Sequence, residues 1–107
     1  MDLVKAVGAD GAEPRVHDDK RPELSKGPLT VSSLAQSLAA LMPDNTVILD
    51  DSATASMVCY PATATAAPHD WLTLTGGAIG FGLPCAVGAA VACPQRKIVS
   101  LEGDGSA

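Results

Sequence analysis

Apolar side chains recur at helical spacing along the segment that begins near Thr30. Thr30 is a good helix N-cap, Ser33 with Gln36 fits a capping box one turn further in, and Pro43 ends the pattern. The polar residues of the segment fall on the opposite face. The pattern therefore predicts an amphipathic helix whose inner face carries Val31, Leu34, Ala35, Leu38, Leu41 and Met42.

Short apolar runs predict strands that are buried on both faces. Residues 46–49 form the first run and lead into Asp50 and Asp51, and residues 97–101 form the second and lead into the turn 102–106. Residues 71–74 predict a third, shorter strand. Alternating helices and buried strands indicate an α/β fold, here a partial doubly wound, mostly parallel sheet. In such sheets ligands bind at the carboxyl ends of the strands.

Glycine and proline divide the chain between these strands. Residues 76–82 contain four glycines, so the backbone must turn sharply there or approach another group closely. The segment from Pro84 to Pro94 predicts a buried helix of small residues, and residues 61–68 predict a loop. Residues 51–56 predict either a capped turn into a short helix or a turn in which the hydroxyls of Ser52 and Thr54 also donate to an anion. The sequence leaves both interpretations open.

The first 28 residues differ from the rest of the chain. They mix acidic and basic residues with glycine and proline and show no apolar period, which predicts a solvated linker or tail. Residues 29–107 then form one domain or part of one, because 107 residues cannot hold a multi-domain enzyme. Only three residues are aromatic, so we expect a core of Ala, Val, Leu and Ile.

The distribution of charge limits the kinds of ligand. A formal net charge of -5 disfavours a nucleic-acid partner, since phosphate backbones are held by clustered Lys and Arg. No Lys or Arg occurs between Leu29 and Gln95. An anion bound by that stretch would have to use backbone N–H groups, hydroxyls, a helix N-terminus or a metal ion.

Two other interpretations of the glycine-rich region are rejected. Residues 71–94 carry no charge and are long enough to cross a bilayer, but the crowded glycines and Pro84 would leave backbone groups unsatisfied in lipid. A dinucleotide site is also disfavoured. Gly80 and Gly82 are followed by Cys85 where a third glycine is needed, and no acidic residue ends the next strand at the spacing that holds a ribose.

Four segments in fixed order resemble the diphosphate-binding domain of thiamine-diphosphate enzymes, in the acetolactate synthase and benzoylformate decarboxylase group. The segments are residues 76–84, Gly88-Ala89, Pro94-x-Arg96-x-Ile98-Val99 and Gly103-Asp104-Gly105-Ser106. The strong match covers about a third of the chain, and the helix after Thr30 and the strand into Asp51 extend it more weakly. The resemblance implies that residues 29–107 are the N-terminal part of this domain.

The resemblance also implies roles for single residues at the diphosphate end. Asp104 is expected to bind Mg²⁺, and Gly103 and Gly105 to let the backbone approach the phosphates. The N–H of Ser106 would donate to the diphosphate from the start of a following helix. Ser52 and Thr54 would donate to the same group, and Ala53 stands where relatives often carry Gly or Thr.

At the other end of the cofactor the glycine block is expected to hold the pyrimidine. In the family the carbonyl equivalent to that of Gly77 accepts a hydrogen bond from the aminopyrimidine, and the side chain equivalent to Ile79, after Ala78, supports the bent cofactor. Core packing of Ile79 remains the alternative. No catalytic residue is assigned. His69 with Asp70 is interpreted as a solvated loop pair and His17 as a linker residue, and Glu102 as the end of a strand.

The activating glutamate of the family lies on a separate pyrimidine-binding domain, and the second metal ligand, an Asn, lies beyond the point where this chain ends. We therefore expect a fragment of a thiamine-diphosphate- and Mg²⁺-dependent lyase or transferase acting on 2-oxo acids, completed by that domain or by another subunit. The alternative is a non-catalytic remnant or interaction module. A chain of this kind is expected to be poorly stable alone, or to associate through its sheet edge.

Cysteine usage gives one further expectation. Cys59, Cys85 and Cys93 are odd in number, show no CxxC or zinc spacing, and follow no secretory signal. They are expected to be buried free thiols in a cytoplasmic protein.

Overall fold

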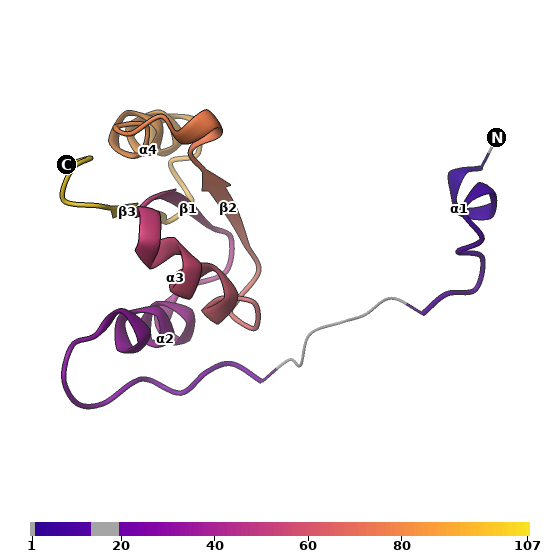
Figure 1. Ribbon diagram of the computed structural model, residues 1–107, viewed down its shortest axis with the longest axis horizontal. Coiled ribbons are helices and arrows are strands. Elements are labelled where there is room, and N and C mark those ends of the chain that lie inside the picture. Colours follow the sequence, from indigo (N-terminus) through magenta and orange to yellow (C-terminus); the bar gives the residue numbers. More distant parts are fainter. Residues whose placement is uncertain (1, 14–19) are drawn as a thin grey trace.

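The computed structural model describes residues 2–13 and 20–107 and contains a three-stranded parallel sheet (Figure 1). The strands are β1 (Thr46–Asp51), β2 (His69–Thr73) and β3 (Ile98–Glu102), in the order β2-β1-β3. β1 pairs in parallel with both neighbours. The α/β fold and the parallel sheet predicted from the sequence are confirmed.

Helices cover both faces of this sheet. α2 (Val31–Leu41) and α3 (Ser56–Ala62) pack together on one face, and α4 (Gly82–Ala92) lies on the other (Figure 1). The chain moves from β1 to β2 in one direction and returns past β1 to reach β3. Right-handed crossovers that run in opposite directions place their helices on opposite faces, which explains the arrangement.

The core lies around β1, the central strand. All six residues of β1 are buried, and Ile48 and Leu49 are fully enclosed. Ala35 and Ala39 of α2 are also fully buried, and small side chains of this kind allow the close packing of α2 against α3. As expected, the core is aliphatic, with Met42 and Cys59 in addition.

The start and end of α2 follow from its sequence with one correction. Thr30 is the N-cap, but the capping box pairs it with Ser33: the Thr30 hydroxyl accepts from the Ser33 N–H at 3.1 Å, and the Thr30 N–H donates to the Ser33 hydroxyl at 2.8 Å. The predicted box of Ser33 with Gln36 is wrong because a box joins the N-cap to the third helical residue. Met42 is the C-cap, directly before Pro43.

Three other predicted boundaries shift. β2 starts at His69 and ends at Thr73, rather than spanning 71–74. α3 runs through Pro61 to Ala62, so the predicted loop starts later; proline removes one N–H but its fixed φ is helical, and only one residue of α3 follows it. α4 starts at Gly82, which places Pro84 in the first turn, where proline is tolerated.

The uncharged stretch 71–94 forms the end of β2, a short 3-10 helix η2 (Thr75–Gly77), a turn and α4. In the part of the chain that the structure describes, no helix has both the length and the apolar character to cross a bilayer.

The described residues before α2, 2–13 and 20–30, contribute little to the core. α1 (Leu3–Ala6) has no buried residue. Arg21, however, contacts the end of α2. Its guanidinium donates to the Met42 carbonyl at 3.2 Å and lies 3.4 Å from the Asp44 carboxylate, so that it caps this helix end. His17 lies outside the described residues, and the division at residue 28 stays a prediction.

Candidate functional site

Three segments meet at the carboxyl edge of the sheet. Because all strands are parallel, the turn after β1, the glycine block after β2 (residues 75–82) and the turn after β3 (residues 103–106) lie at one edge. The strand order reverses at β1, and Asp51 at its end pairs in register with Glu102 of β3. This is the place where an open α/β sheet forms a ligand crevice.

Asp51 joins these three segments. Its carboxylate accepts hydrogen bonds from the N–H of Gly80 at 2.8 Å and the N–H of Gly82 at 3.3 Å. Its backbone carbonyl accepts from the N–H of Gly103 at 3.1 Å. The residue is 3% exposed. In the sequence, the only signal for this role of Asp51 is an acidic residue at the end of a buried strand.

Asp50 points to the opposite face of the sheet and has a different set of partners. Its carboxylate accepts from the Ser52 hydroxyl at 2.6 Å, the Ser52 N–H at 3.1 Å, the Trp71 indole at 3.1 Å and the Ser56 hydroxyl. Burial alone would raise the pKa of Asp50, but these hydrogen bonds outweigh it and hold the pKa below its ordinary value. Asp50 therefore organises the turn after β1 as a charged group.

The turn after β1 presents its two hydroxyls differently. Ser52 is buried and both its hydroxyl and its N–H are bonded to Asp50, whereas Thr54, in the 3-10 helix η1 (Ala53–Ala55), is exposed. Within the described residues the Thr54 hydroxyl has no hydrogen-bond partner. Ala53 has φ +49°, a left-handed conformation that suits glycine better than alanine. Thr54 is thus the freer of the two predicted donors.

The backbone of the glycine block forms a tight turn at this edge of the sheet. Gly76, Gly77 and Gly80 have positive φ values of 66°, 73° and 89°. The Gly77 carbonyl accepts from the Ile79 N–H at 3.0 Å, which closes a tight turn around Ala78. Ile79 is 75% exposed, so core packing within this chain does not account for it.

The turn after β3 is closed by Ser106. The Ser106 hydroxyl accepts from the Gly103 N–H at 3.0 Å and donates to Glu102 at 2.9 Å, and the Ser106 N–H donates to the Gly103 carbonyl at 3.1 Å. The N–H expected to face a diphosphate is therefore engaged within the turn. Asp104 and Gly105 are exposed, and the Asp104 carboxylate accepts no hydrogen bond from any described residue.

Glu102 lies at the end of β3, as predicted, and its side chain packs against the start of α4. A Cβ atom at Gly82 would stand 2.1 Å from Glu102 Oε1, so any larger residue there would require this carboxylate to move. The same carboxylate accepts from the hydroxyls of Ser100 and Ser106. Gly82 is therefore held between the carboxylates of Asp51 and Glu102.

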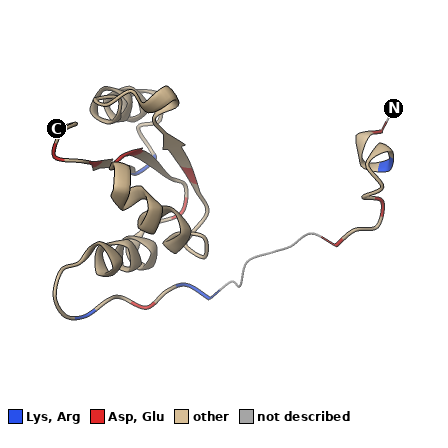
Figure 2. Cartoon of the chain, viewed as in Figure 1, with Lys and Arg blue, Asp and Glu red and all other residues tan. Residues whose placement is uncertain are grey.

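This edge of the sheet is acidic. Figure 2 shows acidic residues at the ends of β1 and β3 and no charged residue on α2, α3 or α4. Asp50, Asp51 and Glu102 accept hydrogen bonds from the protein, which leaves Asp104 as the carboxylate free to bind a ligand. Among the described residues, no group of three or more His, Cys, Asp or Glu side chains is arranged to hold a metal ion. At this edge a metal ion would be bound by the Asp104 carboxylate. Its other ligands would have to come from groups other than these carboxylates.

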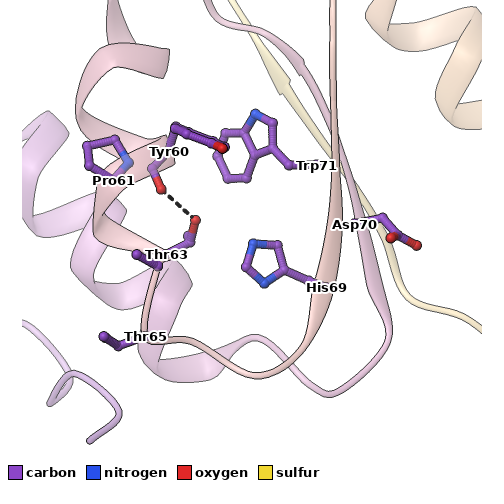
Figure 3. A pocket seen from close by; sticks show the side chains of 8 residues that line it. Tyr60, Pro61, Thr63, Thr65, His69, Asp70 and Trp71 are labelled. Atoms are coloured by element: carbon purple, nitrogen blue, oxygen red, sulfur yellow. Dashed lines mark hydrogen bonds between the residues drawn. The ribbon is translucent and has the colours of Figure 1, made fainter. Parts of the chain in front are cut away.

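His69 and Asp70 lie within β2, far along the strand from the carboxyl edge, and not in a loop. His69 points into an open pocket of about 800 Å³ beside Trp71 and Tyr60, with its Nδ1 2.8 Å from the Ala67 carbonyl oxygen (Figure 3). Asp70 points away from it and forms an ion pair with Arg96 at 2.6 Å. The predicted pairing of these two side chains is wrong, because successive residues of a strand point to opposite faces.

Arg96 links the amino ends of β1 and β2 by hydrogen bonds. In addition to Asp70 of β2, its guanidinium donates to the carbonyl of Asn45 at 2.6 Å and that of Thr46 at 3.3 Å, at the start of β1. Arg96 itself lies two residues before β3. The arginine of the sequence pattern therefore stabilises the sheet at the end opposite the candidate site.

The three cysteines are free thiols, but only one is buried. Cys59 of α3 is enclosed, and burial together with the nearby Asp50 charge raises the pKa of its thiol. Cys85 and Cys93 are partly exposed, so the expectation that all three are buried is wrong for these two.

Comparison with known proteins identifies the family of this chain. Residues 51–107, over half of the chain, match the family described as thiamine pyrophosphate enzyme, C-terminal TPP binding domain. Thiamine pyrophosphate is the same compound as thiamine diphosphate. No solved structure matches the chain.

Three relatives illustrate the similarity. The chain is 50% identical over 99 residues to a Mycobacterium tuberculosis protein named "Putative acetolactate synthase large subunit IlvX", covering 92% of this chain and 19% of the relative. It is 42% identical over 80 residues to the large subunit of acetolactate synthase isozyme 1 of Escherichia coli, covering 74% and 14%. It is 32% identical over 81 residues to benzoylformate decarboxylase of Pseudomonas aeruginosa, covering 76% and 15%.

The chain spans about a fifth or less of the length of these relatives. The family match begins at Asp51 and includes the glycine block, α4, β3 and the turn that follows it. By this family match, the chain belongs to the thiamine pyrophosphate enzyme family, in the C-terminal TPP-binding domain.

Proposed function

We propose that this chain supplies the diphosphate-binding edge of a thiamine-diphosphate- and Mg²⁺-dependent enzyme that acts on 2-oxo acids. The observation that carries the proposal is the free carboxylate of Asp104 at an edge that has no cation between Leu29 and Gln95. A diphosphate placed among the carboxylates of this edge would be repelled unless a divalent cation lay between them.

The proposed roles of the residues follow from their exposure. Asp104 binds Mg²⁺ through a carboxylate oxygen, and the exposed backbone at Gly105 admits the phosphates. The Thr54 hydroxyl donates to a phosphate oxygen from the turn after β1. Ser52 and Ser106 are proposed as further hydrogen-bond donors to the diphosphate. Each must first break a hydrogen bond within its own turn. Their contribution is therefore proposed to be weaker than that of Thr54.

At the other end of the site the glycine block orients the cofactor. The Gly77 carbonyl oxygen has a second lone pair beyond its bond from Ile79 and can accept from the pyrimidine amine. The exposed Ile79 side chain supplies an apolar surface beneath the cofactor, next to Ala78. When bound, thiamine diphosphate supplies the electron sink for cleaving or forming the bond next to the carbonyl of a 2-oxo acid, while the protein supplies orientation.

The enzyme is proposed to need a pyrimidine-binding domain from another chain or from a longer polypeptide. Support comes from α4, whose side chains are uncharged and whose Leu83, Val87 and Val91 are exposed. A helix with apolar residues on all sides is normally buried. The alternative is a non-catalytic module that keeps the fold.

Calorimetric titration separates the two proposals. The chain is titrated with thiamine diphosphate in Mg²⁺ and again in EDTA, and the Asp104→Ala variant is titrated in parallel. Asp44→Ala is the matched control, since Asp44 is an exposed aspartate at the other end of β1. We expect Mg²⁺-dependent binding that Asp104→Ala weakens at least tenfold and Asp44→Ala leaves unchanged. Absence of binding by the unaltered chain contradicts a cofactor-binding function.

A further inference from the structure

The glycine block is attached to the sheet almost entirely through one side chain. Within residues 76–81 the backbone hydrogen bonds are local: the Ile79 N–H donates to the Gly77 carbonyl, and the Phe81 N–H donates to the Ala78 carbonyl. Among the described residues, the hydrogen bond that ties this segment to a strand ends on Asp51, as does the bond from Gly82, the first residue of α4. A segment with three left-handed glycines has little conformational preference of its own, so its position depends on this contact.

Asp51 also contacts the turn after β3, which is the other half of the site. Its carbonyl accepts from Gly103, at the start of the turn that carries Asp104. Its Cα is in register with that of Glu102. One residue thus contacts both the segment that would face the pyrimidine and the turn that would face the diphosphate.

The carboxylate of Asp51 is unsuited to contact the diphosphate itself. It carries a negative charge, and its Oδ2 atom accepts both glycine N–H groups. Phe81, the N-cap of α4, gives no side-chain cap, so Asp51 also provides the acceptor that this helix N-terminus lacks. Charge-assisted bonds of this kind are stronger than those between neutral groups.

We propose that Asp51 is a positioning residue that holds the glycine block at a set distance from the 103–106 turn, so that the two ends of the cofactor are bound together. This inference rests on the proposed function. It assigns Asp51 a role different from that of Ser52 and Thr54, which would touch the diphosphate directly.

The test follows the Gly80 and Gly82 amides and the cofactor affinity in the same variants. Asp51→Ala removes the acceptor, and Asp51→Asn keeps an amide oxygen in its place. Asp104→Asn changes a direct metal ligand, and Asp44→Asn is the control for loss of a carboxylate. Amide exchange is measured by NMR without cofactor, and binding of thiamine diphosphate with Mg²⁺ is measured by calorimetry.

In Asp51→Ala we expect both amides to exchange at least tenfold faster and the cofactor to bind at least tenfold more weakly, with Asp51→Asn restoring part of each. Asp104→Asn should weaken binding and leave both amides unchanged. If Asp51→Ala does not fold, Asp51→Asn is compared with the unaltered chain in its place.

Three results overturn the inference. In the first, the amides of the Asp51 variants exchange as in the unaltered chain. In the second, they exchange faster but affinity is unchanged. In the third, the unaltered chain binds no cofactor, which contradicts the proposed function and the positioning role with it. The first two results, obtained with normal binding by the unaltered chain, contradict the positioning role alone.

Discussion

The carboxylate of Asp51 accepts a hydrogen bond from the N–H of Gly80 at 2.8 Å, across 29 positions of sequence. This contact brings a segment without regular structure onto the carboxyl end of the central strand. Much of the candidate site therefore depends on buried polar contacts rather than on apolar packing. Removing one partner of such a contact leaves a buried polar group without a hydrogen bond, which lowers stability.

Two glycines of α4 should respond in opposite ways to alanine. A Cβ atom at Gly82 would displace the Glu102 carboxylate from Ser100 and Ser106, whereas a Cβ atom at Gly88 meets nothing within 4 Å. We expect Gly82→Ala to lower the free energy of unfolding by about 1–2 kcal/mol. Gly88→Ala should raise it by about 0.5–1 kcal/mol, because alanine favours the helix interior. Urea unfolding measures both, and equal effects would contradict the close approach at Gly82.

Asp50 predicts a dependence of stability on pH. Its pKa is lower in the folded chain, so its stabilising contribution is complete above the ordinary value of about 3.9 and is lost as the pH falls through the lower, folded value. Asp50→Asn should therefore destabilise the protein at pH 7 and reduce the change in stability between pH 7 and pH 2. Urea midpoints measured across this range for the two chains provide the test. Parallel curves would show that Asp50 does not contribute.

Cys59 should react with thiol reagents more slowly than the other two cysteines. It is buried and the pKa of its thiol is raised, whereas Cys85 and Cys93 are partly exposed. Alkylation at pH 8 followed by mass spectrometry should modify Cys85 and Cys93 first, and Cys59 at a comparable rate only in denaturant. Early modification of Cys59 in the folded chain would contradict its placement.

Arg96 should matter more for stability than Arg21. Arg96 bonds to two carbonyls before and within β1 and to Asp70, while Arg21 makes a more exposed contact with Met42 and Asp44. Arg96→Lys cannot keep the planar set of donors, so we expect a loss of about 1–2 kcal/mol, against about 0.5 kcal/mol or less for Arg21→Lys. Similar losses in urea unfolding would show that Arg96 does not fasten the strands.

The isolated chain should be marginally stable. Its core is small and aliphatic, and large apolar side chains remain exposed, among them Leu41, Val87 and Val91. We expect a free energy of unfolding below about 5 kcal/mol, or concentration-dependent association through the free edge of β3. Urea unfolding and analytical ultracentrifugation test this. A monomer that unfolds cooperatively at high denaturant would contradict it.

The order of elements could be predicted from local patterns. The helix after Thr30, the strand that ends in Asp50-Asp51 and the strand before Glu102 each have a period or apolar run of their own. The four segments that carry the family resemblance, from the glycine block to the final turn, also have local signatures. Boundaries were less predictable, as at Pro61 and His69, because tertiary contacts decide where short elements end.

The contacts of the site could not be predicted in the same way. The pattern Asp50-Asp51 does not show that one carboxylate bonds to Ser52 and Trp71 and the other to the glycine block. That difference depends on the strand's alternation and on which helix covers which face. Likewise, only the folded turn shows that the Ser106 N–H is engaged with Gly103. The roles of Ser52, Thr54 and the glycine block toward a cofactor stay predictions.

The most direct test of the central claim is paramagnetic broadening by Mn²⁺, which replaces Mg²⁺ at oxygen sites and broadens nearby NMR signals. The amide spectrum is recorded with thiamine diphosphate and a small amount of Mn²⁺. We expect selective broadening of Asp104, Gly105, Ser106 and Thr54, with His69 and Arg96 at the opposite end of the sheet unaffected. Broadening centred elsewhere, or none at these residues, would contradict a metal-linked diphosphate site at this edge.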